Sequence, residues 1–365
     1  MVDRFVNCSK SLKLNGLEVF PPTILSPMAG VTDPPFRRLV RELSAGRMGI
    51  LVSEFVSTDG CGPEKLLDKP QAIFYPEERP FGIQIFGRDP GRMADAAEIL
   101  ATLKPDFIEV NAGCPVPKVA DKGGGAGLLK DLPRLQAIIH EVKKRISIPL
   151  TLKCRLGWDE NSINVFDTLK IAEDEGVEWL VVHGRTRVQG YMGFADWNMI
   201  GEVASRAKIP VVGNGDIVSA AGAVAAMEKY PVAGLSIGRG ALHNPWLFAQ
   251  ISDAFEGKPV RTISAAEAMG TFKTYFNYML EDGCPDYGAL GRLKQLAARL
   301  CKGIFPDYPE FRQRLLTSET AEQFLERAER FCETEAEGRV FEPERLLNLN
   351  GLKTDEVTFG RQFKG

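Results

Sequence analysis

The sequence predicts an α/β protein built as a TIM (β/α)8 barrel, followed by a C-terminal all-helical region. Three observations predict this fold. Eight short apolar segments recur between residues 24 and 237, longer amphipathic segments separate them, and polar or glycine-rich residues directly follow seven of the eight. Buried strands that alternate with helices form parallel sheets, because parallel neighbours need crossover connections. Eight such units favour a closed barrel over an open sheet, and the active face of such a barrel lies at the C-terminal ends of its strands.

The expected barrel elements follow the chain in order. The strands are Ile24–Ser26, Ile50–Val56, Phe81–Phe86, Phe107–Val110, Leu150–Arg155, Trp179–His183, Val211–Gly213 and Gly234–Ile237. Amphipathic patterns predict intervening helices that include Arg92–Leu103, Leu132–Arg145 and Val165–Glu175.

The strand–helix alternation stops after about Gly257. Three helical patterns follow, at Ala265–Asp282, Tyr287–Ile304 and Ser318–Cys332, with Ser318 as the start of the last. We therefore expect a barrel catalytic domain over residues 1–256 and a helical domain over residues 257–365, whose tail from Gly338 is irregular.

Composition narrows the class of protein. The net charge is −3, and no apolar run of about 18 residues is present, so no membrane span is expected. The segment Met1–Lys13 lacks the apolar core of a secretory signal, which makes the cytoplasm the expected location. The cysteines occur singly and there are three histidines, which disfavours a disulfide framework or a metal centre. They are Cys8, Cys61, Cys114, Cys154, Cys284, Cys301 and Cys332.

Two glycine-rich segments at the end of the predicted barrel indicate an anion site. Gly213–Asp216 follows one strand and Gly238–Gly240 follows the next, and Arg239 adds a cation. Loops after strands seven and eight are the usual phosphate site of these barrels. The alternative is that the glycines only form tight turns.

Gln84 and Lys153 lie on the third and fifth predicted strands and suit a flavin. An amide can pair with the pyrimidine edge of the ring, and a lysine can stabilise the reduced anion. The alternative is a structural lysine that pairs with a buried carboxylate such as Glu109 or Glu54.

Cys114 follows the fourth strand in the segment Asn111–Pro115. A lone cysteine is most often an inert buried residue. Between glycine and proline on the active face, however, a thiol that is protonated at neutral pH suits a general acid. A nucleophilic role would need a base, for which His183 is the candidate by strand order. The following segment, Lys118 to Gly125, is expected to be a mobile loop over this face, with or without a function.

The segment Tyr287–Ser318 carries six basic residues and two acidic ones. Arg292, Arg299 and Lys302 recur at helical spacing on this otherwise acidic protein. Such a face can contact a phosphate backbone, or it can simply be solvated.

Taken together, the motifs resemble those of the tRNA-dihydrouridine synthase family. They occur in the family's order over nearly the whole barrel. The Asn-x-Gly-Cys-Pro segment is highly specific for the family when it occurs together with the other motifs. They are Ser26–Asp33, Gly82–Gly87, Asn111–Pro115, Leu152–Trp158, Val182–Thr186, Asn214–Asp216 and Ile237–Ala241. The motifs are most similar to those of the bacterial B-type and C-type branches. Glu109 and Gly127 stand where the family more often has aspartate and alanine.

The resemblance implies an oxidoreductase with FMN as hydride carrier and NADPH as its transient reductant. Hydride would pass from FMN to C6 of uracil, and Cys114 would protonate C5, with Asn111 and Arg155 beside the base. The family's flavin contacts fall on Pro27, Met28, Ala29, Gln84, Lys153, His183, Asn214, Gly215, Asp216, Gly238 and Arg239. The helical domain, with Arg292 and Arg299, would bind tRNA, and a monomer without a metal is expected.

Two other functions fit part of the pattern. An FMN barrel oxidoreductase that acts on a free pyrimidine, as dihydroorotate dehydrogenase does, would share the flavin loops without needing the helical domain. An RNA-binding module with a vestigial barrel would need neither Cys114 nor the flavin contacts.

Overall fold

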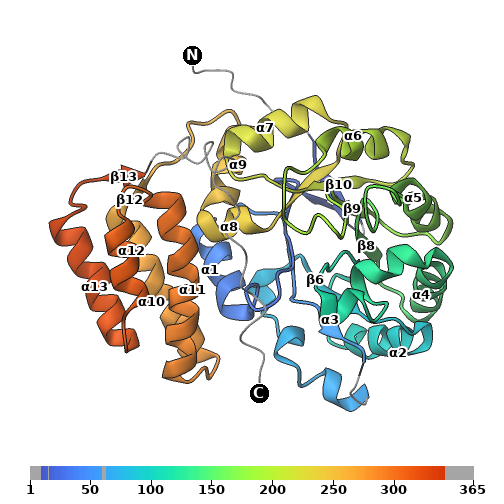
Figure 1. The fold of residues 1–365 in the computed structure, drawn as a ribbon, viewed down its shortest axis with the longest axis horizontal. Helices are drawn as coiled ribbons and strands as arrows, with labels where there is room; N and C mark the ends of the chain where they lie inside the picture. Colours follow the sequence, from blue (N-terminus) through green and yellow to red (C-terminus); the bar gives the residue numbers. More distant parts are fainter. Residues whose placement is uncertain (1–9, 15, 60–62, 342–365) are drawn as a thin grey trace.

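A computed structural model describes residues 10–14, 16–59 and 63–341, and it confirms the predicted barrel (Figure 1). Cys8, Cys61, most of Met1–Lys13 and the tail beyond Phe341 lie outside these residues. Eight parallel strands form one sheet in the order β4-β3-β11-β10-β9-β8-β7-β6, and pairing of β4 with β6 closes it. The barrel strands are β3 (Thr23–Leu25), β4 (Ile50–Val52), β6 (Phe81–Phe86), β7 (Phe107–Ala112), β8 (Leu150–Arg155), β9 (Leu180–His183), β10 (Val211–Asn214) and β11 (Gly234–Ile237).

All eight predicted strands are present; β9 begins one residue later than expected, and β4 is clearly shorter. The segment Ile50–Val56 was expected to be a single strand, but β4 ends at Val52 and a separate strand, β5 (Val56–Ser57), pairs with β6. Glu54 lies in the break, where its carboxylate accepts a hydrogen bond from the backbone N–H of Gly30. The strand is therefore interrupted where a side chain at the strand end turns toward a neighbouring loop.

Helices surround the barrel, and local capping determines where several of them begin. Asp89 caps α2 and Pro90 occupies its first turn, so this helix begins two residues before the predicted Arg92. Asp131 caps α4 in the same way. The helices of this part are α1 (Pro34–Leu43), α2 (Pro90–Ala101), α3 (Pro117–Ala120), α4 (Leu132–Arg145), α5 (Val165–Asp174), α6 (Trp197–Arg206), α7 (Ala220–Lys229), α8 (Arg239–His243) and α9 (Leu247–Phe255). Four 3-10 turns accompany them, η1 (Pro63–Leu66), η2 (Pro70–Ala72), η3 (Pro76–Glu78) and η4 (Gly125–Lys130).

The barrel interior is filled at its N-terminal end. A hairpin of β1 (Leu12–Leu14) and β2 (Leu17–Val19) precedes β3, and its buried Leu12 and Val19 join the apolar side chains of the barrel interior. These interior residues include Ile24, Phe107, Trp179, Val181 and Val212. Apolar side chains thus fill this end, and we call the opposite end, where the barrel strands have their C-termini, the mouth.

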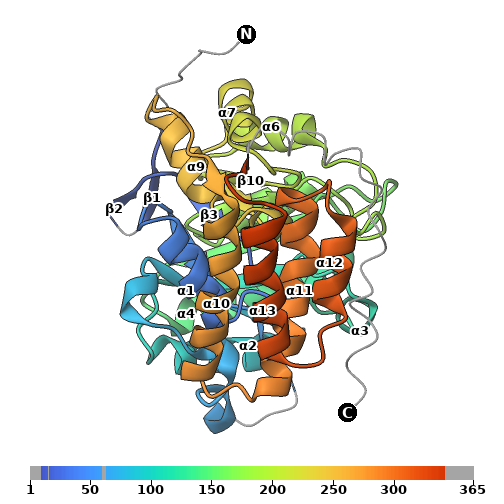
Figure 2. The same cartoon turned by 90° about the vertical axis from the view of Figure 1, so that its left-hand side faces the viewer.

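The C-terminal helices pack against one side of the barrel (Figures 1 and 2). Helix α10 contacts α1, and α11 contacts α8. These elements are β12 (Ile263–Ser264), α10 (Ala265–Glu281), α11 (Asp286–Ile304), α12 (Pro309–Leu316), α13 (Ala321–Thr334) and β13 (Val340–Phe341).

Three details of this region differ from the prediction. Helix α12 was not expected. The last helix begins at Ala321 and not at Ser318, because Thr320 supplies the capping oxygen, whereas the Ser318 hydroxyl donates to the carbonyl of Arg314 at the end of α12. Finally, Val340–Phe341 was expected to be irregular but pairs with Ile263–Ser264 as an antiparallel strand.

Candidate active site

The strand register brings the predicted polar residues together at the mouth. Asn111 on β7 lies opposite Lys153 on β8, and His183 on β9 lies between Arg155 on β8 and Asn214 on β10. All of them stand at or near the C-terminal ends of their strands. The sequence prediction that these side chains share one face of the barrel is therefore confirmed.

A chain of hydrogen bonds links the barrel interior to the Cys114 loop. The backbone N–H groups of Gly113 and Cys114 donate to Asn111 Oδ1, each at 2.9 Å. Asn111 Nδ2 donates to Gln84 Oε1 at 2.8 Å, and Gln84 Nε2 donates to Glu109 Oε1 at 2.7 Å. An ionised carboxylate can only accept, so Glu109 fixes the orientation of the Gln84 amide and, through it, that of Asn111.

The Cys114 thiol is buried and lies beside the Arg155 guanidinium. Burial raises the pKa of Cys114, while the N–H of Val116 and the charge of Arg155 offset part of this effect. The thiol therefore keeps its proton at neutral pH, as a general acid requires, and a thiolate nucleophile is disfavoured.

The segment after Cys114 is packed and not an open loop. The N–H of Ala126 donates to the carbonyl of Cys114 at 3.1 Å, and residues 124–129 are buried. Gly125 has a φ of +52°, and a Cβ there would lie 2.9 Å from Cys114 Cβ. A glycine is needed because both the backbone angle and the close contact exclude a side chain. The expectation of a mobile loop over the active face is thus not supported for this part of the segment.

Buried cations outnumber carboxyl groups at the mouth. Lys153 Nζ donates to Asn214 Oδ1 at 2.8 Å, and among the described ion pairs within 4 Å none joins Lys153 to a carboxylate. Arg185 Nη2 lies 2.8 Å and 2.9 Å from the two oxygens of Asp216, and Arg239 is 3.4 Å from the same carboxylate. We call Lys153, Arg155, Arg185 and Arg239, with Glu109 and Asp216, the mouth cluster.

The crowding of positive charge shifts several titrations. Burial lowers the pKa of His183 well below its ordinary value, and the charges of Arg155, Lys153, Arg185 and Arg239 lower it further. His183 is thus neutral at pH 7. Burial also lowers the pKa of Lys153, although Glu109 opposes this, and it lowers the pKa of Arg155 to about 10. A site that keeps several positively charged side chains close together and largely out of water is suited to an anionic ligand.

The two glycine-rich segments lie next to each other at the mouth. Gly215 and Asp216 both have positive φ, of +129° and +56°, and Gly238 caps the short helix α8. A Cβ on Gly238 would lie 3.5 Å from the sulfur of Met28, which brings the segment after β3 to the same place. Pro27 and Met28 are half-buried there and Ala29 is exposed. The hydroxyl of Ser236 on β11 is buried with no hydrogen-bond partner among the described residues.

One arginine that the sequence analysis named, and two residues that it missed, organise the mouth. Arg155 is almost fully buried, and its Nε donates to the Gly113 carbonyl at 2.8 Å. Arg185 and Tyr191 were not singled out, yet the Tyr191 ring lies 4.7 Å from the Arg239 guanidinium and 5.6 Å from that of Arg155. Both residues follow the predicted strand Trp179–His183, and this position was the sequence signal that could have identified them.

The two arginines that were expected to bind RNA have different surroundings. Arg292 on α11 forms an ion pair with Asp33, the residue that caps α1. Arg299, two turns further along α11, lies near the mouth, where its charge contributes to the lowered pKa of Arg239 after the larger effect of burial. A structural role therefore competes with RNA binding for Arg292.

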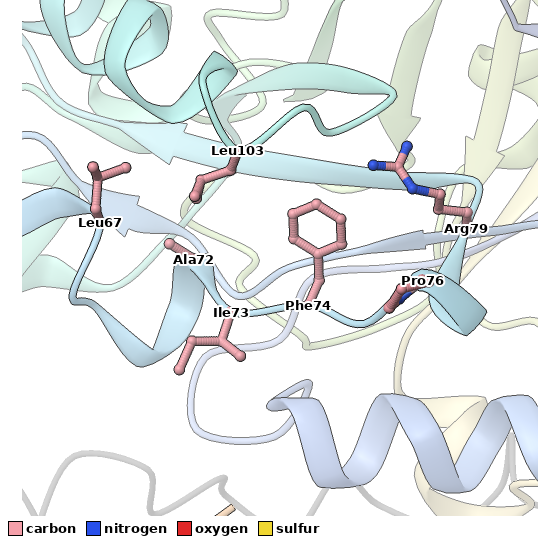
Figure 3. Close-up of a pocket in the computed structure, with 7 residues that line it drawn as sticks. All are labelled: Leu67, Ala72, Ile73, Phe74, Pro76, Arg79 and Leu103. Atoms are coloured by element: carbon pink, nitrogen blue, oxygen red, sulfur yellow. The ribbon is translucent and has the colours of Figure 1, made fainter.

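A cavity of about 350 Å³ lies at the other end of the barrel (Figure 3). Two of its lining residues, Arg79 and Leu103, come shortly before β6 and β7, which places the cavity at the N-terminal ends of the strands. Phe74 projects toward it from the segment before β6 (Figure 3). The cavity is thus separate from the mouth, and nothing in its lining is chemically reactive.

The part of the chain that the structure describes has neither a metal-binding cluster of side chains nor a membrane-spanning helix. No group of three or more His, Cys, Asp or Glu side chains is arranged to hold a metal ion. Within the same residues, no helix combines the length and apolar character needed to cross a membrane.

Comparison with known proteins identifies relatives. A family model described as dihydrouridine synthase matches residues 24–337. A probable tRNA-dihydrouridine synthase of Rhodobacter capsulatus is 40% identical over 253 residues, which cover 68% of this chain and 76% of the relative. The tRNA-dihydrouridine synthase B of Pseudomonas putida is 42% identical over 228 residues, which cover 62% and 67% of the two chains.

Solved structures share the fold at low sequence identity. Histamine dehydrogenase from Rhizobium sp. 4-9 has a TM-score of 0.52 at 10% identity, and the match covers 76% of this chain and 51% of that one. The 6-hydroxypseudooxynicotine amine oxidase from Pseudomonas geniculata N1 has a TM-score of 0.53 at 13% identity and covers 75% and 53%. At these identities the likeness concerns the barrel fold alone.

Proposed function

This chain belongs to the dihydrouridine synthase family, and we propose that it reduces the C5=C6 bond of specific uridines in tRNA with FMN and NADPH. The observation that carries the proposal is the placement of a protonated thiol, Cys114, beside a mouth where buried cations exceed carboxyl groups. Two relatives, 40% and 42% identical to the chain over 253 and 228 aligned residues, carry the name of this activity.

The residues at the mouth fit a flavin mononucleotide. The excess of cations suits its phosphate and the negative charge of its reduced ring, and the buried Ser236 hydroxyl has no partner among the residues that the structure describes. Gly215, Gly238 and Arg239 would hold the phosphate, with Asp216 orienting Arg239. The ring would lie against the segment Pro27–Ala29, with Gln84, Lys153, His183 and Asn214 around it. When bound, FMN supplies the hydride, which is the one step that protein side chains cannot perform.

The protein's own groups would orient the base and deliver the proton. Cys114 Sγ holds the proton that goes to C5 of the uracil. Asn111 and Arg155 hold the backbone of the Cys114 loop on two sides, through the hydrogen bonds to Gly113 and Cys114. Both groups are largely committed to this role, so their contact with the uracil would come from their remaining hydrogen-bonding capacity. The target base must leave its stack to reach the mouth, which costs a few kcal/mol in a duplex and less in a loop.

The barrel and the C-terminal helical region would have different functions. We propose that residues 1–256 bind FMN and carry the chemistry, and that residues 257–365 bind tRNA through α11. Arg299 is the stronger candidate for a phosphate contact, because α11 packs on α8 beside the mouth. A tRNA substrate agrees with a cytoplasmic location, and a monomer suffices, since every group named at the mouth comes from one chain.

Reconstitution of the full chain tests this function. Purified protein with FMN, NADPH and an unmodified tRNA transcript should produce dihydrouridine that mass spectrometry maps to defined positions. Free uridine monophosphate, assayed in parallel, should react far more slowly. Comparable reduction of the free nucleotide would favour the alternative of a free-pyrimidine oxidoreductase. A protein that stays colourless with added FMN would exclude both flavin functions.

A further inference from the structure

Exposed apolar side chains gather on the loop between β9 and α6, beside the mouth. Val188, Met192 and Phe194 are 60%, 65% and 66% exposed, and we call these three residues the apolar rim. Single exposed apolar residues are ordinary on protein surfaces, but a group on one short loop marks a contact surface.

Two buried arginines hold this loop in a fixed shape. Arg155 Nη1 donates to the carbonyls of Thr186 at 2.9 Å and Gly190 at 2.8 Å. Arg185 donates to the carbonyls of Met192 at 3.1 Å and Gly193 at 2.6 Å. Burial of a guanidinium is costly unless its donors are satisfied, so four loop carbonyls turned inward stabilise both arginines. The inward backbone leaves the side chains of the apolar rim toward solvent.

Arg155 also connects the loop of the apolar rim to the loop that carries Cys114. Arg155 binds the Gly113 carbonyl through Nε and the Thr186 and Gly190 carbonyls through Nη1. A single guanidinium therefore bridges the loop that carries Cys114 and the loop that carries the apolar rim. A large ligand that inserts a base toward Cys114 would therefore come near the apolar rim.

Cations next to the apolar rim favour a nucleic acid as the ligand. The N–H of Val188 donates to the carbonyl of Trp158 at 2.9 Å. The ring of Trp158 lies 4.5 Å from the Arg187 guanidinium and 4.6 Å from Lys130 Nζ. Apolar and aromatic side chains that alternate with cations are typical of surfaces that stack unpaired bases and contact their phosphates.

We propose that the apolar rim, and above all its one aromatic residue, Phe194, stacks against the unpaired bases that flank the extruded uridine. The inference rests on the proposed function and names how the substrate is held. Extrusion of one base exposes the faces of its neighbours to water, and an apolar surface at the entrance would cover them. The apolar rim would thus select unpaired RNA, whereas cations on α11 would contact any phosphate backbone.

Substitution of Phe194 in the full-length flavoprotein tests the proposal. Phe194→Ala should weaken the Kd for an unmodified tRNA transcript about five- to 100-fold, the range for loss of one stacked base. It should raise KM with little change in kcat. The slope of log Kd against log salt should stay as in the wild type, because no phosphate contact is lost. Phe194→Trp should restore binding, and a fully paired RNA duplex should bind both variants equally.

Leu17→Ala provides the matched control, since Leu17 is 54% exposed on β2, at the N-terminal end of the barrel. It should leave tRNA binding unchanged. Wild-type affinity in Phe194→Ala would overturn the proposal, as would an equal loss of duplex binding. A self-association that light scattering detects in the wild type and not in Phe194→Ala would also overturn it in favour of a second copy. Failure of the wild type to bind or reduce tRNA would refute the proposed function instead.

Discussion

Two clusters of buried and half-buried charges in this molecule differ in how their charges are balanced. One is the mouth cluster. The other, which we call the junction cluster, lies where the β3 and β4 strand ends meet the C-terminal helices, and it comprises Arg37, Asp33, Glu54, Glu78 and Arg292. In the junction cluster Arg37 pairs with Glu78, Arg292 pairs with Asp33, and Glu54 accepts from the N–H of Gly30.

The difference between the clusters separates structure from function. Every carboxylate of the junction cluster has a donor within the protein, so the cluster needs no ligand. The mouth cluster has four cations against two carboxyl groups, and burial lowers the pKa values of Lys153, Arg155 and Arg239. Uncompensated buried charge is expensive, and proteins retain it where a ligand supplies the counter-charge.

The strongest test of the mouth as a reaction centre is removal of its acid. Cys114→Ala should lower turnover on tRNA about 10²- to 10⁴-fold, the usual contribution of a general acid, with the flavin still bound. Single-turnover oxidation of the reduced flavin by tRNA measures the effect. Cys154→Ala is the matched control, because Cys154 is fully buried in the apolar core and should alter stability but not the rate. Equal rates for the wild type and Cys114→Ala would remove Cys114 from the mechanism.

The contrast in charge balance predicts different consequences when a cation is removed from each cluster. Lys153→Met should weaken FMN binding about 10- to 100-fold, since a charge-assisted hydrogen bond contributes roughly 1.5–3 kcal/mol. Titration of the flavin-free protein with FMN, followed by flavin fluorescence, measures it. Stability should fall less than when a cation is removed from a close ion pair, because Glu109, whose pKa Lys153 holds down, can take up a proton once the lysine is gone.

Arg37→Met is the counterpart in the junction cluster. Arg37 and Glu78 have side chains with no exposed surface, so the variant leaves a buried carboxylate unpaired. The free energy of unfolding should fall by about 3–5 kcal/mol. FMN affinity, measured below the unfolding transition, should not change. If Lys153→Met lost stability and Arg37→Met lost FMN affinity, the distinction between the clusters would be wrong.

The hydrogen-bond chain from Glu109 to Cys114 predicts a pH effect. Burial raises the pKa of Glu109, although Lys153 on β8 and bonds from Gln84 and Thr151 oppose this. As pH falls toward that raised pKa, Glu109 takes up a proton, can donate to Gln84, and no longer fixes its amide. We expect the acidic limb of the kcat profile to lie above the ordinary pKa of glutamate, about 4.3.

Glu109→Gln removes that titration without changing the size of the side chain. It should abolish the acidic limb and lower kcat about two- to tenfold over the whole range, as expected for one misoriented hydrogen bond. Glu109→Asp, which keeps a carboxylate, should retain an acidic limb in the kcat profile. The measurement is kcat between pH 5 and 9. An unchanged acidic limb in Glu109→Gln would show that another group titrates.

Local sequence signals predicted the barrel well. Helix α4 begins and ends where its apolar periodicity does, because Asp131 caps it and the pattern runs to Arg145. Cys114 could be placed at the mouth because its position after a strand determines its face. Helix α12 was missed because eight residues carry too little periodicity.

Contacts between distant segments could not be predicted in the same way. The bond from Gln84 to Glu109 depends on the register of β6 against β7, and periodicity does not specify register. Asp33 and Arg292 are 259 positions apart, and no local pattern indicates that they meet. The sequence therefore predicted RNA binding for both Arg292 and Arg299, whereas in the structure Arg292 forms an ion pair with Asp33.

The smallest expected effect tests this separation of Arg292 from Arg299. Arg292→Ala should lower the free energy of unfolding by about 1 kcal/mol, a value at the low end because 41% of the Arg292 side chain is exposed. It should leave the salt dependence of tRNA binding unchanged. Arg299→Ala should reduce the slope of log Kd against log salt by about 0.7–0.9, the loss of one phosphate contact. Urea denaturation and binding titrations from 50 to 200 mM salt measure the two effects. An equal reduction of the slope in both variants would mean that Arg292 leaves Asp33 to contact RNA, and the junction cluster would then belong to the substrate site.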